Sequence, residues 1–339
     1  MDTRLDSLRD WLQGLPPTLG LRLDSLRPAS NDASFRRYFR VDAGGAPGGT
    51  LVAMDAPPPL EDVRPFVHAA EVLGRGGVSV PRVLDADVRN GYLLLEDFGS
   101  VTYLSVLDAS TAPALYADAS RALVAMQTAG RPDDFPPYDR ALLLRELQLY
   151  PDWYVAKHKG VTLSDDERNT LAAAFESILA NVLAQPRVHV HRDYHSRNLM
   201  LLPGERNPGI LDFQDAVVGP VTYDLVSLLR DAYVSWDEEQ VLDWAIRHWE
   251  RARRAGLPMP AEFGDFYRDF EWMGLQRHLK VLGIFARLYH RDGKDRYLAD
   301  LPLVLRYVRD AARRYGALAP LARLVDRIEG EAPGVGYTF

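Results

Sequence analysis

Cysteine is absent from the 339 residues of this chain. Without it there is no disulfide, no thiol nucleophile and no cysteine-ligated zinc, and the composition fits a reducing compartment. No apolar run is long enough to span a membrane, and residues 1–13 carry three aspartates where a signal peptide has an apolar core. We therefore expect a cytoplasmic protein.

An excess of positive charge is missing too, because the formal net charge is -7. This balance argues against nucleic acid or an anionic membrane as a partner, and no segment indicates an obligate protein partner. The apolar fraction of 47% is ordinary and allows a sizeable core. A chain of 339 residues exceeds the usual size of a single core, so two lobes are expected.

The first part of the chain has the alternation of short strands. A hairpin is expected over residues 35–41 and 51–54, and a helix from Pro65 separates it from strands at 83–86 and 92–95. Later residues are mostly helical in period. Helices are expected at 114–128 and 140–154, after a capping box at 164–167, and from residues 223, 238, 263 and 296.

These patterns predict an α+β fold with two lobes. The N-lobe, residues 1–96, is a small antiparallel sheet with one helix. Residues 97–99 form a hinge, and residues 100–339 form a mostly helical C-lobe.

The chemistry is concentrated in residues 191–198, which read HRDYHSRN, and in the sequence ILDF at 210–213. The order places a base, a metal ligand, a short connection and a second metal ligand. In phosphoryl transfer these are the roles of Asp193 as catalytic base and of Asn198 and Asp212 as magnesium ligands. Asp224 is expected to cap a helix and to brace this loop. A zinc site at His189, His191 and His195 is a weaker alternative, because no cysteine or free carboxylate assists it.

This H-x-D-x-x-x-x-N pattern resembles the catalytic loop of the aminoglycoside-phosphotransferase and choline-kinase group, which has a protein-kinase-like fold. The resemblance covers nearly the whole chain. It implies ATP as co-substrate and Mg²⁺ as cofactor. It also implies that the N-lobe binds nucleotide, that the backbone around Glu96 to Phe98 is the adenine-binding hinge, and that the C-lobe carries the catalytic loop and the acceptor site. Several strings further resemble bacterial anomeric amino-sugar kinases of peptidoglycan recycling: SFRRYF at 34–39, VAMDAPP at 52–58, LLEDFG at 94–99 and RHLKVLG at 277–283. Such enzymes phosphorylate the C1 hydroxyl of N-acetylmuramate or N-acetylglucosamine.

The nucleotide side departs from the family pattern in two places. Asp55 stands where kinases of this fold place a strand lysine, so another cation must compensate, and Glu71 lacks the lysine it would pair. The candidate cations are Arg36, Arg37 and Arg40, of which strand alternation puts Arg37 on one face and the others on the opposite face. The phosphate loop at 31–34 has no glycine. The ATP-binding residues implied are Asn31, Ser34, Arg37, Glu96 and Phe98.

The acceptor site is expected on the helix after residue 263. Basic residues recur there at helical spacing and suit an acceptor that carries a carboxylate; the alternative is an ordinary solvated face. The candidate acceptor ligands are His195, Arg277, Lys280 and Arg287. Tyr150, Trp153 and Tyr154 are candidates for stacking on a sugar, or else core residues.

We thus expect an ATP-dependent kinase of a small amino sugar. An antibiotic or choline-type phosphotransferase is the nearest alternative, although a polycationic substrate calls for an acidic site. A nucleotide-binding pseudokinase is the alternative of another class, suggested by Asp55. A protein kinase is disfavoured because no long activation segment follows Asp212.

Overall fold

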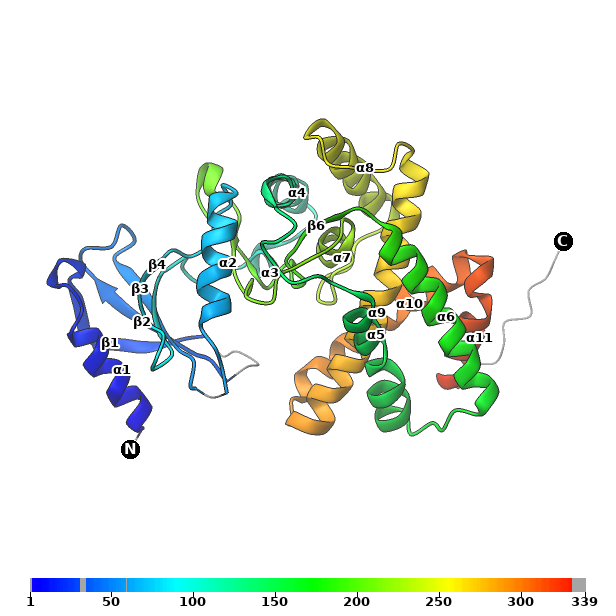
Figure 1. Ribbon diagram of the computed structural model, residues 1–339, viewed down its shortest axis with the longest axis horizontal. Helices are drawn as coiled ribbons and strands as arrows, with labels where there is room; N and C mark the ends of the chain where they lie inside the picture. Colours follow the sequence, from blue (N-terminus) through cyan, green and yellow to red (C-terminus); the bar gives the residue numbers. More distant parts are fainter. Residues whose placement is uncertain (1, 31–34, 59, 331–339) are drawn as a thin grey trace. The chain divides into compact units, whose positions relative to one another are not determined.

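The computed structural model describes residues 2–30, 35–58 and 60–330, which form two compact units (Figure 1). The first unit combines Met1–Val106 with Arg197–Ala216, and the second combines Leu107–Ser196 with Val217–Phe339. Each unit is therefore built from two separate segments of the chain.

A five-stranded antiparallel sheet organises the first unit, with strand order β1-β2-β3-β5-β4. Its strands are β1 (Leu21–Ser30), β2 (Arg37–Ala43), β3 (Thr50–Asp55), β4 (Val83–Asp87) and β5 (Tyr92–Glu96). Across β2 and β3 the register pairs Arg37 with Asp55 and Val41 with Leu51. The predicted hairpin and the two later strands are confirmed.

Helix α1 (Thr3–Gln13) packs on one face of this sheet. Its Leu8 and Leu12 are buried in one cluster with the strand residues Phe39, Val41, Ala43, Leu51, Ala53, Tyr92 and Leu94. Side chains alternate along a strand. The sheet therefore presents Arg37 and Asp55 to α1, and Arg40 to the opposite side.

The rest of the first unit consists of short elements around α2 (Arg64–Arg75). These are α3 (Tyr103–Val106), the 3₁₀ turns Pro17–Leu19 and Gly204–Arg206, and the ribbon of β7 (Leu199–Met200) and β8 (Gly209–Ile210). Phe66 of α2 packs on Phe213, with ring centroids 4.7 Å apart. Single bridges join Gly209 to Ser79 and Met200 to Thr102, so the ribbon is part of the first unit.

The second unit is mostly helical. Its helices are α4 (Ala112–Ala129), α5 (Arg140–Leu147), α6 (Asp165–Ala184), α7 (Tyr223–Leu229), α8 (Glu238–Arg254), α9 (Phe263–Asp292), α10 (Leu301–Arg314) and α11 (Ala319–Ile328), with 3₁₀ turns at Asp295–Asp300 and Gly316–Leu318. The 30-residue α9 contacts α5, α6, α7, α8 and α10, and its middle is buried on all sides. An antiparallel pair, β6 (Arg187–Val190) and β9 (Val217–Pro220), leads into residues 191–196.

Two helix predictions are wrong at their boundaries. The segment 140–154 is not one helix, because α5 ends at Leu147 and a π-helix follows at Tyr150–His158. Pro151 explains the change, since it has no amide proton to donate to the α-helical ladder. Tyr150 and Tyr154 of this segment are 0% and 2% exposed, so they are core residues. The helix expected from residue 296 begins as a 3₁₀ turn and becomes α-helical at Leu301.

The predicted α+β class is confirmed, with the antiparallel sheet in the first unit and a mostly helical second unit. The capping box of α6 is also confirmed, because Ser164 and Glu167 exchange side-chain and backbone hydrogen bonds. The hinge at 97–99 stays a prediction. Across residues 2–30, 35–58 and 60–330, no helix has the length and apolar character needed to cross a membrane.

Substitution of two glycines of α9 by alanine is expected to change the stability of the protein in opposite directions. A Cβ on Gly283 would clash with the backbone carbonyl of Leu149, whereas one on Gly264 would meet no atom within 4 Å. We expect Gly283→Ala to destabilise the protein by about 1–3 kcal/mol through overpacking. Gly264→Ala should leave stability unchanged or raise it by up to about 1 kcal/mol. Thermal melts of the two variants test this, and equal shifts in Tm would contradict the close packing at Gly283.

Candidate active site

Two buried aspartates hold the part of the predicted catalytic loop that lies in the second unit. Asp224, in the first turn of α7, accepts hydrogen bonds from the amides of His191 (2.6 Å) and Arg192 (3.0 Å). Asp231 accepts from the amide (3.0 Å) and the hydroxyl of Ser196. Arg192 has a φ of 77°, which is unfavourable for a residue other than glycine. The two carboxylates therefore stabilise a loop conformation that the chain would not adopt on its own.

The bracing role predicted for Asp224 is thus confirmed. The capping role is wrong, because Asp224 lies inside α7 and its bonds go to the loop. The N-cap residue of α7 is Thr222, and its side chain forms no capping hydrogen bond.

Asp193 lies among three cations and one histidine of the second unit. Burial raises the pKa of Asp193, but the charges of Lys280, His195, Arg277 and Arg192 outweigh it and hold the pKa below its ordinary value. The carboxylate is therefore ionised at neutral pH, which is the state that a general base requires.

A carboxylate distant in the sequence compensates two of these charges. Glu146 of α5 lies 2.5 Å from Nη2 of Arg192 and 3.0 Å from Nζ of Lys280, and it accepts a hydrogen bond from the Tyr138 hydroxyl. Lys280 also donates to the hydroxyl of Tyr223 at 3.0 Å. Burial raises the pKa of Glu146, yet the two cations hold it below its ordinary value. Lys280 is therefore bonded within the protein, and direct contact with a substrate stays a prediction.

The structure gathers three of the four predicted acceptor ligands around Asp193. Arg277 and Lys280 are buried on α9, so the alternative of a solvated face is wrong for both, and His195 is buried in the loop. Arg287 lies ten residues beyond Arg277, roughly 15 Å further along the helix axis. Arg287 is therefore not among the side chains gathered around Asp193, and its role as an acceptor ligand stays a prediction.

The predicted metal ligands belong to the first unit and lie side by side. Nδ2 of Asn198 is 3.4 Å from Oδ2 of Asp212, and Gln214 donates to Oδ1 of Asp212 at 2.8 Å. Asp212 has a φ of 63°, so its position is held by the surrounding contacts. One carboxylate and one amide oxygen fit Mg²⁺, which takes few protein ligands and completes its shell with phosphates and water.

A zinc site has no support in the part of the chain that the structure describes. No cluster of three or more His, Asp or Glu side chains there could hold a metal ion. His189, one of the three histidines considered, lies 3.1 Å from Asp134 and packs edge-to-face on Phe135. These contacts account for the buried position of His189 without a metal ion.

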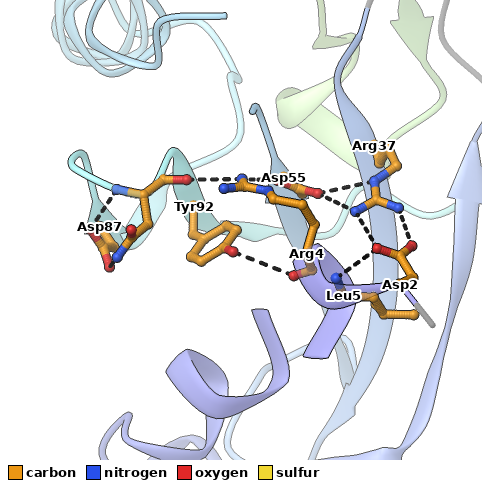
Figure 2. Close-up of polar contacts among 8 residues, drawn as sticks. Asp2, Arg4, Leu5, Arg37, Asp55, Asp87 and Tyr92 are labelled. Atoms are coloured by element: carbon orange, nitrogen blue, oxygen red, sulfur yellow. Dashed lines mark hydrogen bonds and ion pairs between the residues drawn. The ribbon is translucent and has the colours of Figure 1, made fainter. Parts of the chain in front are cut away.

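Asp55, at the position of the kinase lysine, is fully buried and bonded to two arginines (Figure 2). Nη2 of Arg37 lies 2.5 Å from one of its oxygens, and Arg4 of α1 reaches the other. Arg37 also pairs with Asp2, and Arg4 donates to the carbonyl of Asn90 at 2.9 Å. The charge of Asp55 is therefore compensated on the α1 side of the sheet. Arg37, predicted to bind ATP, is engaged in the same network.

The other two candidate arginines differ in their partners. Arg40 forms a two-point ion pair with Asp97 and donates to the carbonyl of Gly99. Nη2 of Arg36 lies 3.6 Å from Oδ1 of Asp212, and its Nε lies 3.9 Å from Glu61. Among the three arginines, Arg36 is the one beside the predicted metal ligand.

Two other predicted nucleotide contacts are only partly described. The side chain of Glu96 pairs with Arg206 at 2.7 Å and with Arg82 at 3.1 Å, and Phe98 is buried. The adenine contact of the backbone at this hinge stays a prediction. Glu71 is exposed on α2, which favours its interpretation as a surface residue. The predicted phosphate-loop ligands Asn31 and Ser34 lie outside the described residues.

Residues 25–258 match the model of the phosphotransferase enzyme family. The chain belongs to this family. This phosphotransferase is 49% identical over 337 residues to the N-acetylmuramate/N-acetylglucosamine kinase of Neisseria meningitidis serogroup B, with 98% of each chain covered. It is also 49% identical over 331 residues to the protein of the same name from Pseudomonas aeruginosa, with 96% of each covered.

The fold comparison agrees with the family. A choline/ethanolamine kinase family protein from Mesorhizobium loti superposes with a TM-score of 0.60 at 17% identity, covering 96% of this chain and 99% of that one. The predicted kinase-like fold and the family resemblance are therefore confirmed. The chain is an enzyme of phosphoryl transfer, and kinases of this kind take ATP as their co-substrate.

Three residues of the site were not predicted: Glu146, Asp231 and Glu61. Their partners Arg192, Ser196 and Arg36 are separated from them by 46, 35 and 25 residues. A single sequence carries no signal for such pairs. The one available hint is that Glu146 interrupts an apolar run, ALLLRELQL, where a buried carboxylate requires a cation.

The stability of this phosphotransferase is expected to depend on pH through Asp224, which holds the loop. Burial raises the pKa of Asp224 to about 7, despite the amide hydrogen bonds and the charge of Arg277 that lower it. The folded protein thus binds this proton more tightly than the unfolded chain, and stability falls as pH rises towards 7. Asp224→Asn removes the titration. Its Tm should therefore improve relative to the wild type between pH 5.5 and 7.5, by the equivalent of about 2 kcal/mol.

Thermal melts of both proteins across this range provide the test. The variant loses one hydrogen-bond acceptor, which shifts its plot of Tm against pH by a constant amount. This shift does not change how the difference in Tm between the two proteins varies with pH. Parallel curves would show that Asp224 stays in one protonation state.

Proposed function

We propose that this phosphotransferase moves the γ-phosphoryl group of ATP to the anomeric C1 hydroxyl of N-acetylmuramate and N-acetylglucosamine, a step of peptidoglycan recycling. The observation that supports this most is the 49% identity to kinases of that name over 98% of the chain. Cytoplasmic location and the absence of nucleic-acid, membrane and protein partners stay predictions that fit such a reaction.

Asp193 is the base in this proposal. It accepts a hydrogen bond from the C1 hydroxyl, orients that oxygen toward the γ-phosphorus, and takes its proton as the new P–O bond forms and the bond to ADP breaks. A positioned base contributes typically 10²- to 10⁴-fold, about 3–5 kcal/mol of barrier. An anomeric hydroxyl is more acidic than other sugar hydroxyls, so a base of lowered pKa suffices.

Asn198 and Asp212 hold the magnesium ion in this proposal. When bound, Mg²⁺ neutralises charge on the β- and γ-phosphates. The fixed φ of Asp212 and its bond from Gln214 hold the carboxylate in place before the ion arrives, so little ordering is needed on binding.

Arg36 supplies the positive charge that the missing strand lysine would bring to the phosphates. All three arginines pair with carboxylates of the first unit, but only the partner of Arg36 among these aspartates, Asp212, is a proposed magnesium ligand, whereas Arg37 pairs with Asp55 and Arg40 with Asp97. Glu61, 3.9 Å from Nε of Arg36, takes the place of the helix glutamate that pairs the lysine in other kinases of this fold.

The charge around Asp193 separates this function from its nearest alternative. A site for a polycationic aminoglycoside needs carboxylates, but the side chains that most lower the pKa of Asp193 include Lys280, Arg277 and Arg192. The pseudokinase alternative loses its basis as well, because the charge of Asp55 is balanced by Arg4 and Arg37.

Phosphorus NMR of the protein with Mg-ATP and N-acetylmuramate tests the function directly. A new signal coupled to the sugar H1 is the expected result. Phosphate on another oxygen would keep the kinase chemistry and overturn the anomeric assignment. Bound ATP without product on either amino sugar or on an aminoglycoside would favour the pseudokinase.

Asp193→Asn tests the base. The substitution should reduce kcat by roughly 10²- to 10⁴-fold and leave the Kd for Mg-ATP nearly unchanged, because the lost group acts on the acceptor hydroxyl. Coupled turnover assays and calorimetric ATP titration measure the two quantities. Normal turnover would show that another group takes the proton.

A pair of neighbouring arginines tests the nucleotide side. Arg36→Met should raise the KM for ATP about tenfold or more, with a small change in Tm. Arg37→Met should mainly lower Tm, since it deprives the buried Asp55 of a partner, at about 1–3 kcal/mol. The reverse pattern, with ATP binding more sensitive to Arg37, would assign the phosphate contact to Arg37.

A further inference from the structure

Arg277 differs from the other cations buried in the second unit. It is 3% exposed, and its Nη1 is buried without a hydrogen-bond partner. Within residues 2–30, 35–58 and 60–330, no side chain forms a hydrogen bond or ion pair with its guanidinium. A buried charge without such a partner is strongly unfavourable unless a bound ligand supplies the opposite charge.

The neighbouring cations show how this chain usually treats a buried charge. Arg230 pairs with Glu271 at 3.2 Å, and Lys280, one turn from Arg277 on α9, pairs with Glu146 at 3.0 Å. Arg192 pairs with the same glutamate at 2.5 Å. Each of these cations has a carboxylate supplied by the protein. Arg277 has none at ion-pair distance, so its missing counter-ion points to a ligand.

The position of Arg277 indicates which ligand. Arg277 lies one turn from Lys280 on α9, and Lys280 shares Glu146 with Arg192, the residue that precedes Asp193. The guanidinium is therefore near the proposed base, and its charge lowers the pKa values of Asp193 and Asp224. Both oxygens of Asp224 already accept backbone amides. A molecule whose hydroxyl meets Asp193 would therefore bring its other substituents near Arg277.

We propose that Arg277 binds the carboxylate of the acceptor and makes the enzyme prefer the amino sugar that carries a lactyl group. This rests on the proposed function. The two amino sugars differ by this one anionic group, which N-acetylmuramate has and N-acetylglucosamine lacks. A guanidinium matches a carboxylate with two parallel N–H···O bonds, which gives orientation as well as charge.

The first experiment compares kcat/KM for both sugars in the wild type and in Arg277→Met. The ratio of the N-acetylmuramate value to the N-acetylglucosamine value should fall about 100-fold, or about 2.7 kcal/mol. Arg277→Lys should recover part of the ratio, because it keeps the charge and loses the planar fork. Arg268→Gln is the matched control, since Arg268 is a half-exposed arginine of the same helix paired with Asp265, and its ratio should equal that of the wild type.

Thermal stability provides a second readout. Because Arg277 has no partner within the protein, Arg277→Met should melt at or above the temperature of the wild type. An arginine with only a structural role would give the opposite result. A Tm several degrees lower would therefore overturn the proposal.

The remaining outcomes are also decisive. An equal loss for both sugars would assign Arg277 to the transferred phosphate, which both reactions share, and would overturn the carboxylate assignment. An unchanged ratio would overturn it too. A wild type that phosphorylates neither sugar would refute the proposed function itself, a result distinct from any change in the ratio.

Discussion

Two backbone amides, those of His191 and Arg192, donate hydrogen bonds to the carboxylate of Asp224, and these bonds hold the start of the predicted catalytic loop. These bonds help to stabilise the positive φ of Arg192. With Arg192 in that conformation, its guanidinium reaches Glu146, which also holds Lys280. The bonds to Asp224 therefore help to place one of the charges that act on Asp193.

The placement of charge follows one rule in both units. Asp55 and Glu146 are buried and each is bonded to two cations, which leaves neither carboxylate to repel a phosphate or an anionic acceptor. These ion pairs involve Arg4, Arg37, Arg192 and Lys280. Arg277 is not part of them, and its Nη1 is buried without a hydrogen-bond partner. Arg36, in contrast, lies at ion-pair distance from both Asp212 and Glu61.

The sequence alone was sufficient for the fold class and for most strands and helices, because these have local signatures, with periods of 2 and 3.6. The catalytic loop, a contiguous string, stays a prediction. The sequence was insufficient where the answer lies in a distant partner. Strand alternation separated Arg37 from Arg36 and Arg40, but only the contacts with Asp55, Asp97 and Asp212 distinguish their roles. The π-helix at 150–158 likewise arises from one proline in a segment of otherwise helical period.

The interleaving of the two units bears on how the chain is synthesised. The first unit needs residues 197–216, which supply β7 and β8, as well as residues up to 106. Those later residues leave the ribosome only after the whole segment 107–196 has emerged. The first unit therefore remains incomplete while more than half of the chain is made, and neither unit can finish folding well before the other begins.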